Sequence, residues 1–587
     1  MNVLIIETGG VVLKDKQNTF IKGALILAGA NFVVKIIGAL FKVPLYNLIG
    51  EEGSGVFNVA YQIYTFMFII ATAGFPIAVS KMVAESIAKN DEYDARRIFE
   101  TAQFLLGIIG LVGSTVLFAF AKPLAGLINN ADAELPIRVI APAVFFVSLV
   151  SAYRGYFQGR QNMYPTAASE VVEASGKLLI GIIAASAVMS LKAVNMPAGS
   201  SFPTGIFSSF HERTVYAATG AIFGVTAGTF LCLILMIIIF AVREKRVKPI
   251  SGQIIRPRSS ILRELVAIAI PITIGASVSS LTSLVDLATI MNRLVVNPDV
   301  FDNYAHIFAE GTEFAQSMAE EGWEGLVLLQ KKANSLYGMY TGQAQTMFNL
   351  PLTIVVGLSM SIVPAISAAL AEKKPREAQE ITASVLRITM LFALPCAMGF
   401  FVLSEPILRV LYSDANAYLL LQKLAFAVAF VALVSVSNAV LQAYGKVYYP
   451  VINMLVGGVV KVLMNYTLIP VWGIDAAPIA TTACYATIAL LNIFCIVGML
   501  KVKLSVVYMV IKPLTATVIM GAAVVLIYGA LGRIFPGSRL VTIAAIGIGA
   551  AVYAVALIVV KGIKREDVLN MPKGAKIAEL MTKYKLL

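Results

Sequence analysis

A series of long apolar segments restricts the fold of this chain more than any other feature. Fourteen such segments alternate with polar connections. About 20 apolar residues in a helix cross a bilayer, and backbone groups inside lipid must bond within their own segment. The sequence therefore predicts an all-α integral membrane protein with 14 transmembrane helices. The predicted spans are 22–45, 56–80, 99–121, 136–157, 165–190, 215–242, 262–292, 334–370, 380–403, 418–443, 450–470, 476–500, 507–531 and 538–561.

The charge content supports this class and indicates a topology. Only 13% of the 587 residues are charged, whereas soluble proteins have about 25%. The net charge of +13 would suggest nucleic acid in a soluble protein, but here the basic residues lie mostly between spans, and we expect no nucleic-acid partner. With the N-terminus inside, 29 of the 46 lysines and arginines fall in inside segments and 11 in outside segments. The positive-inside rule then predicts that both termini are cytoplasmic.

The residues needed for most catalytic or metal chemistry are sparse. The four cysteines lie in apolar stretches without CxxC spacing, and the two histidines, His211 and His306, fall in loops. The sequence has no nucleotide-binding P-loop, and no carboxylate constellation of the kind a membrane glycosyltransferase would need. We therefore predict no catalytic residues, no metal site and no cofactor, and we do not expect an enzyme.

The first span carries two lysines inside an otherwise apolar helix. Lys35 and Lys42 are seven residues apart, which places them on one helix face. A charge that faces lipid costs a few kcal/mol even on the mildest scales. We therefore expect this face to line an aqueous path for an anionic substrate. For Lys42 an equal alternative remains, because a lysine near a helix end can extend to the interface.

The two halves of the chain resemble one another. The block FPIAVSKMVAE at the end of the second span matches VPAISAALAE at the end of the eighth, and residues 156–177 match 441–461. Since the second span matches the eighth and the fifth the eleventh, the repeat unit has six helices, and the two lobes share one orientation. The matched pairs are Ser80 with Ser367 and Glu85 with Glu372 (offset 287), Gly159 with Gly445 (286), Pro165 with Pro450 (285) and Lys177 with Lys461 (284).

The repeat predicts that the first and seventh spans are equivalent helices beside a central cavity between the lobes. The seventh span carries Asp286 and Arg293, again seven residues apart. Charged residues inside spans are candidates for function. We expect Lys35, Asp286 and Arg293 to face the cavity. Asp286 could instead be a structural partner that neutralises Lys35.

Four further basic residues are candidates for substrate binding, each with an alternative. Lys177 and Lys461 lie near the middle of the fifth and eleventh spans. They could face the cavity or pair with a carboxylate such as Glu170 or Glu173. Arg154 and Arg160 flank a short inside turn. They could bind substrate, or they could serve topology and contact lipid headgroups.

The two longest outside loops are expected at residues 192–214 and 295–333. The second is acidic, and its pattern predicts a short amphipathic helix over Thr312–Glu321. Both loops could gate a substrate path or be surface insertions.

At this point the chain resembles a known superfamily, the multidrug/oligosaccharidyl-lipid/polysaccharide exporters. The likeness is to the branch of stage V sporulation protein B and the lipid II flippase MurJ, and it covers about residues 19–565. It rests on the blocks at residues 35–64, 74–85 and 154–173 and on the fourteen spans. Gln345 and Thr346 precede Leu350-Pro351 where relatives often have an acidic-basic pair, which favours the sporulation-protein-like branch.

The resemblance implies two six-helix lobes around a central cationic cavity, with two further C-terminal helices. It also implies export of an undecaprenyl-pyrophosphate-linked cell-wall precursor or polysaccharide unit across a bacterial plasma membrane, with membrane lipids and cell-wall synthesis proteins as partners. The alternatives are a cation-coupled multidrug exporter and a non-transporting envelope-assembly scaffold. The expected parts are a cytoplasmic tail (1–21), an N-lobe (22–243), a basic linker (244–261), a C-lobe (262–501, with an insertion at 295–333), two helices (502–562) and a basic cytoplasmic tail (563–587).

Overall fold

The computed structural model describes residues 4–191, 207, 209–244 and 255–562. The predicted C-terminal tail and most of the basic linker and of the first long outside loop lie outside the described residues. Helices dominate the described part of the chain, and twelve segments of it are long and apolar enough to span a membrane. The helices are α1 (Leu4–Thr72), α2 (Phe75–Ala88), α3 (Glu92–Ala119), α4 (Ala121–Leu127), α5 (Glu134–Gly159), α6 (Tyr164–Ser190), α7 (Phe210–Arg243), α8 (Arg258–Leu294), α9 (Glu313–Glu321), α10 (Gly325–Met339), α11 (Gln345–Ala371), α12 (Pro375–Leu411), α13 (Tyr418–Ala443), α14 (Tyr448–Trp472), α15 (Ala476–Leu500), α16 (Lys512–Ile534) and α17 (Arg539–Val559).

Glycine and proline divide the longest of these segments. The segment 29–88 has 60 residues and contains a break in α1 at Gly50, where φ is +62°. The segment 448–500 has 53 residues and contains Gly473, also at φ +62°. Such backbone angles suit glycine, because a Cβ would be strained there. Each of the two segments is long enough for two crossings, and the total of fourteen crossings stays a prediction.

Several predicted spans have different boundaries in the structure. The first span is part of α1, which already begins at Leu4 in the predicted tail. The second span is split between α1 and α2, because Pro76 occupies the first turn of a new helix. The eighth span is continuous with α10 through a π-helical turn at Tyr340–Ala344. Apolar patterning locates such spans, but kinks depend on local backbone geometry.

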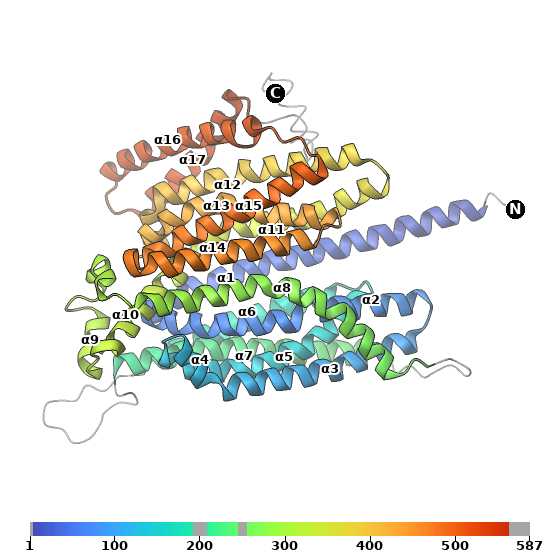
Figure 1. The fold of residues 1–587 in the computed structure, drawn as a ribbon, viewed down its shortest axis with the longest axis horizontal. Coiled ribbons are helices and arrows are strands. Elements are labelled where there is room, and N and C mark those ends of the chain that lie inside the picture. Colours follow the sequence, from blue (N-terminus) through green and yellow to red (C-terminus); the bar gives the residue numbers. More distant parts are fainter. Residues whose placement is uncertain (1–3, 192–206, 208, 245–254, 563–587) are drawn as a thin grey trace. The chain divides into compact units, whose positions relative to one another are not determined.

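The helices, which Figure 1 labels, form two compact units. Unit 1 comprises residues 1–291 and 308–335, and unit 2 comprises residues 292–307 and 336–587. Helix α8, predicted as the first helix of the C-lobe, is therefore grouped with unit 1 up to Met291. Its first half packs Ile261, Leu265 and Ala269 into the core beneath α2, α3 and α7. The predicted lobe boundaries stay a prediction.

The packing inside each unit follows the six-helix repeat. In unit 1, α2 and α3 pack against α5, and α7 packs against α5 and α6. In unit 2, α11 and α12 pack against α13, and α15 packs against α13 and α14. These pairs join the corresponding spans of the two halves. The internal packing thus supports the repeat that the sequence indicates.

The C-terminal helices α16 and α17 pack against each other and against α12 within unit 2. Their shared core contains Leu391, Met520, Ala545 and Tyr553. The Tyr553 hydroxyl donates to the carbonyl of Leu391 at 2.7 Å, so its one polar group is satisfied inside this core. These two helices are the additional pair that the sequence places after the second lobe.

Candidate functional site: a lysine cluster in unit 1

Three lysines of unit 1 come together on α1 and α6. Lys42 interacts electrostatically with both Lys177 and Lys35. The Lys177 ammonium lies 3.9 Å from the centre of the Tyr61 ring and 5.2 Å from that of Phe41. Lys35 is exposed, whereas Lys42 and Lys177 are half-buried. The structure thus joins the sequence-predicted pair on α1 with the sequence-predicted lysine on α6.

Aromatic faces hold the Lys177 ammonium without neutralising it. A cation over an aromatic ring gains roughly 0.5–2 kcal/mol and keeps its full charge. Both rings belong to α1, on either side of the break at Gly50. Lys42, with Lys177 and Lys35 each in electrostatic range of it, forms the centre of a locally cationic region, which is suited to a multiply charged anion.

The carboxylate nearest to Lys177 in the helix is bound elsewhere. Glu173 lies one turn before Lys177 on α6, but its Oε2 accepts from Nη2 of Arg154 at 2.9 Å. Arg154 is buried, and its Nε donates to the hydroxyl of Ser169 at 3.0 Å. Of the alternatives left open by the sequence, pairing between Lys177 and Glu173 is therefore not the arrangement in this structure.

Arg160, the other arginine of the predicted inside turn, joins three helices at one end of unit 1. Its Nη1 lies 2.6 Å from a carboxylate oxygen of Glu92, and its Nε lies 3.5 Å from Glu244. The guanidinium also lies over the ring of Tyr156, at 5.6 Å from its centre. These contacts link the end of α5 to the start of α3 and the end of α7.

The remaining predicted residues are described within their own units. Asp286 is buried in the part of α8 that belongs to unit 1. In unit 2, Lys461 is buried in α14, and the Arg293 guanidinium lies 4.0 Å from the ring centre of Tyr466. A joint cavity lined by Lys35, Asp286 and Arg293 stays a prediction.

The insertion between α8 and α11 contains the predicted amphipathic helix. Helix α9 spans Glu313–Glu321, which agrees with the predicted helix, and the Thr312 side chain caps it by accepting from the amide of Ala315. The insertion is divided between the units, since residues 308–335 belong to unit 1 and residues 292–307 to unit 2. In unit 2, the Tyr304 hydroxyl donates to Asp475 at 2.8 Å. Burial raises the pKa of Tyr304, and the neighbouring Asp475 charge raises it further.

A buried charge cluster fixes the insertion to unit 1. His211, at the start of α7, lies between the carboxylates of Glu52 and Asp132, and Lys331 from α10 contacts both His211 and Asp132. Trp323 packs edge-on against His211 at 4.8 Å between ring centres. Sequence reasoning missed this cluster, because its members are far apart in the chain and only the acidity of the loops indicated charge in this region.

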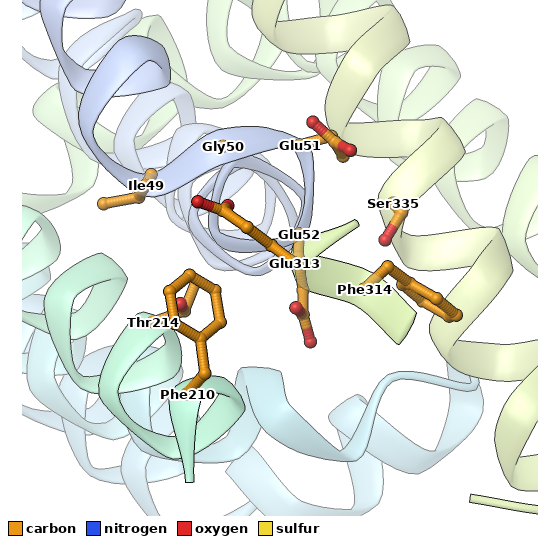
Figure 2. A pocket seen from close by; sticks show the side chains of 9 residues that line it. All are labelled: Ile49, Gly50, Glu51, Glu52, Phe210, Thr214, Glu313, Phe314 and Ser335. Atoms are coloured by element: carbon orange, nitrogen blue, oxygen red, sulfur yellow. The ribbon is translucent and has the colours of Figure 1, made fainter. Parts of the chain in front are cut away.

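A small pocket lies beside this cluster, shown in Figure 2. Side chains of α1, α7 and the insertion surround it, among them Glu52, Glu313 and Phe314. The hydroxyls of Thr214 and Ser335 are buried here, and neither has a hydrogen-bond partner among the described residues. The pKa of Glu313 is raised, because desolvation and the neighbouring Glu52 charge outweigh the lowering by Arg213. The pocket marks where the insertion closes over the break in α1.

Removing the Lys331 ammonium should loosen the insertion. In Lys331→Ala, Asp132 keeps a half-buried charge with fewer partners, which costs about 1–3 kcal/mol. Protease cleavage within residues 308–335 should therefore accelerate roughly tenfold, because the open population increases. Limited proteolysis of the purified protein measures this rate. Glu310→Gln, which removes an exposed charge in the same insertion, should cleave at the wild-type rate. Equal rates for Lys331→Ala and wild type would contradict the assignment.

The fold and the lysine cluster define a polytopic helical membrane protein that holds fixed cations inside its spans. The chain belongs to the polysaccharide biosynthesis protein family, whose model matches residues 20–370. The family model described as lipid II flippase MurJ matches residues 332–544. The two matches together cover both halves of the sequence repeat.

Relatives and solved structures agree with this assignment. The chain is 26% identical to stage V sporulation protein B of Bacillus subtilis (strain 168), over 95% of this chain and 98% of the relative. It is 22% identical to lipid II flippase MurJ of the same organism, over 92% and 94% of the two chains. A solved lipid II flippase MurJ in an inward closed conformation shares the fold, with a TM-score of 0.65, 13% identity and coverage of 91% and 98%. An inward-facing multidrug resistance transporter of the MATE family has a TM-score of 0.60 at 13% identity, with coverage of 81% and 99%.

Proposed function

We propose that this protein is a flippase for a lipid-linked anionic cell-wall precursor. The substrate class is an undecaprenyl-pyrophosphate-linked sugar, either a peptidoglycan precursor or a polysaccharide unit. Two relatives that align with nearly the whole chain are stage V sporulation protein B and lipid II flippase MurJ, which supports this class. The protein acts by transport and not by catalysis. It works in the bacterial plasma membrane with both termini in the cytoplasm.

The lysine cluster of unit 1 is the observation that carries the proposal. A pyrophosphate head cannot enter hydrocarbon without compensation, since a desolvated anion is costly. Lys35, Lys42 and Lys177 offer fixed positive charge inside membrane helices, and the aromatic rings beside Lys177 leave its charge available. The polyprenyl tail can stay in lipid while the head passes.

The remaining site residues extend this proposal to both lobes. Asp286 and Arg293 on α8 and Lys461 on α14 are further substrate-site residues in this proposal: the two cations add positive charge, and Asp286 tunes it. Arg154 and Arg160 act from within unit 1, through the carboxylates that they bind. In this proposal access alternates by rocking of the two six-helix lobes, which are parallel repeats related by an axis along the membrane normal. Membrane lipids and cell-wall synthesis proteins are the expected partners.

A cation-coupled drug exporter is the second candidate, favoured by the fold shared with MATE-family transporters. The two functions use Asp286 differently. In a flippase this carboxylate only tunes a basic site, whereas in a cation-coupled exporter it carries the coupling ion. A scaffold without transport activity would need none of the charges inside the spans.

Reconstituted vesicles can separate the three functions. The wild-type protein should move a labelled undecaprenyl-pyrophosphate-linked sugar across the bilayer and should not move a lipophilic cationic dye. Asp286→Asn should keep at least about a third of the flipping rate, because the fixed cations remain. Dye transport abolished by Asp286→Asn would favour the exporter instead. Vesicles in which neither substrate moves would favour the scaffold.

A further inference from the structure

Two cations of unit 1 are placed to compete for one carboxylate. Glu173 and Lys177 lie four residues apart on α6, with the glutamate first, which is the favourable order for an ion pair within a helix. Arg154 approaches Glu173 from α5. The structure shows the pair between Arg154 and Glu173, at 2.9 Å. The choice of partner for Glu173 therefore decides whether Lys177 is neutralised.

Arg154 is held firmly in this position. Its Nε donates to Ser169 at 3.0 Å, and its Nη2 lies 3.6 Å from the sulfur of Cys232 on α7. Glu170, one turn before Glu173, also interacts electrostatically with Arg154. A buried guanidinium with several partners is costly to displace, since separation would leave it unpaired. Arg154 thus remains paired with Glu173 and in electrostatic range of Glu170 on α6.

Lys177 is oriented away from that carboxylate. In the described part of the chain its contacts are with the rings of Tyr61 and Phe41, and Lys42 lies within electrostatic range. Lys42 repels the Lys177 ammonium, whereas the Glu173 carboxylate attracts it. Without Arg154, Lys177 would therefore gain by turning to Glu173. Arg154 removes this option.

The second half of the sequence supports a linked role for the two residues. With the repeat offsets, Arg154 corresponds to Val440 and Glu173 to Gly457, whereas Lys177 corresponds to Lys461. The second lobe thus keeps the lysine and lacks both members of the pair. An arginine is present only in the lobe where a glutamate precedes the lysine by one turn.

We propose that Arg154 is a positioning residue that sequesters Glu173 and so keeps the Lys177 ammonium unpaired for the phosphate groups of the substrate. This rests on the proposed function, because it assigns Lys177 to the anionic head. Arg154 itself touches no substrate. Its role is to bind Glu173 so that Lys177 keeps a positive charge that no carboxylate neutralises.

A series of charge-neutralising variants with two readouts tests the proposal. In Arg154→Gln, Glu173 is released and pairs with Lys177, so flipping should decrease about tenfold and half-saturation should need more substrate. In the double variant Arg154→Gln/Glu173→Gln, the carboxylate one turn before Lys177 is gone, and flipping should return to within about threefold of wild type.

The second readout needs no transport. Acylation of Lys177 by a water-soluble amine reagent, followed by peptide mass spectrometry, should be about tenfold slower in Arg154→Gln, since an ion-paired ammonium gives up its proton less readily. It should recover in the double variant. Arg160→Gln, which removes the contacts of Arg160 with Glu92 and Glu244, should leave this acylation rate unchanged.

The outcomes are distinguishable. A purely structural role of Arg154 would lower thermal stability and leave Lys177 acylation equal or faster, which would overturn the proposal. A folded double variant whose Lys177 acylation stays slow would overturn it as well. If the acylation series behaves as expected and wild-type protein flips no lipid-linked substrate, the proposed function fails while the role of Arg154 toward Lys177 stands.

Discussion

Lys35→Ala is expected to reduce export of the lipid-linked precursor by about ten- to hundredfold while leaving the protein folded and inserted. Lys35 is exposed on α1 and lies within electrostatic range of Lys42, so its removal takes a charge from the cationic region without opening a packed core. Loss of one charge-assisted contact to a phosphate costs roughly 1.5–3 kcal/mol, which reduces the rate by about ten- to hundredfold. Flipping in reconstituted vesicles measures the effect.

Two further variants make the result specific. Lys35→Arg keeps the positive charge and should retain part of the activity, although a guanidinium differs in shape from an ammonium. Lys81→Ala removes an exposed lysine of α2 that pairs with Glu85 across one helical turn, and it should leave flipping unchanged. Full flipping by Lys35→Ala would eliminate the proposed role of this lysine.

Gly224→Ala should strongly destabilise the packing of α6 against α7 in unit 1. Helices α6 and α7 pack closely, and a Cβ on Gly224 would lie 2.3 Å from the Cα and amide nitrogen of Gly181. These are backbone atoms, which cannot move without shifting a helix. We expect a loss of about 1–3 kcal/mol or more, seen as a lower midpoint of thermal unfolding in detergent.

The control for this change is another helical glycine with open space. A Cβ on Gly38 in α1 would meet no heavy atom within 4 Å. Gly38→Ala should be neutral or slightly stabilising, because alanine favours helix by roughly 1 kcal/mol over glycine. Equal midpoints for Gly224→Ala and Gly38→Ala would show that the contact between α6 and α7 is looser than in this structure.

The sequence alone was sufficient for the class of fold and for several local features. Apolar length predicted helical spans, and the spacing of polar and apolar residues predicted the helix that the structure places at Glu313–Glu321. Repeat offsets predicted equivalent six-helix units, and the internal contacts match for spans two to six and eight to twelve. These features depend on residues that are close in sequence or on patterns that recur along it, and both can be read without coordinates.

The partners of charged residues were decided only by the tertiary structure. The sequence placed Lys177 one turn from Glu173, yet Arg154 on α5 binds that carboxylate. It placed His211 in a loop, yet His211 lies buried among charges from α1, η1 (Ala131–Ala133) and α10. An ion pair depends on the distance between two groups and on their burial, and both are set by how helices cross. Apolar patterning determines that a helix forms, but packing against other helices determines which charges on it remain unpaired.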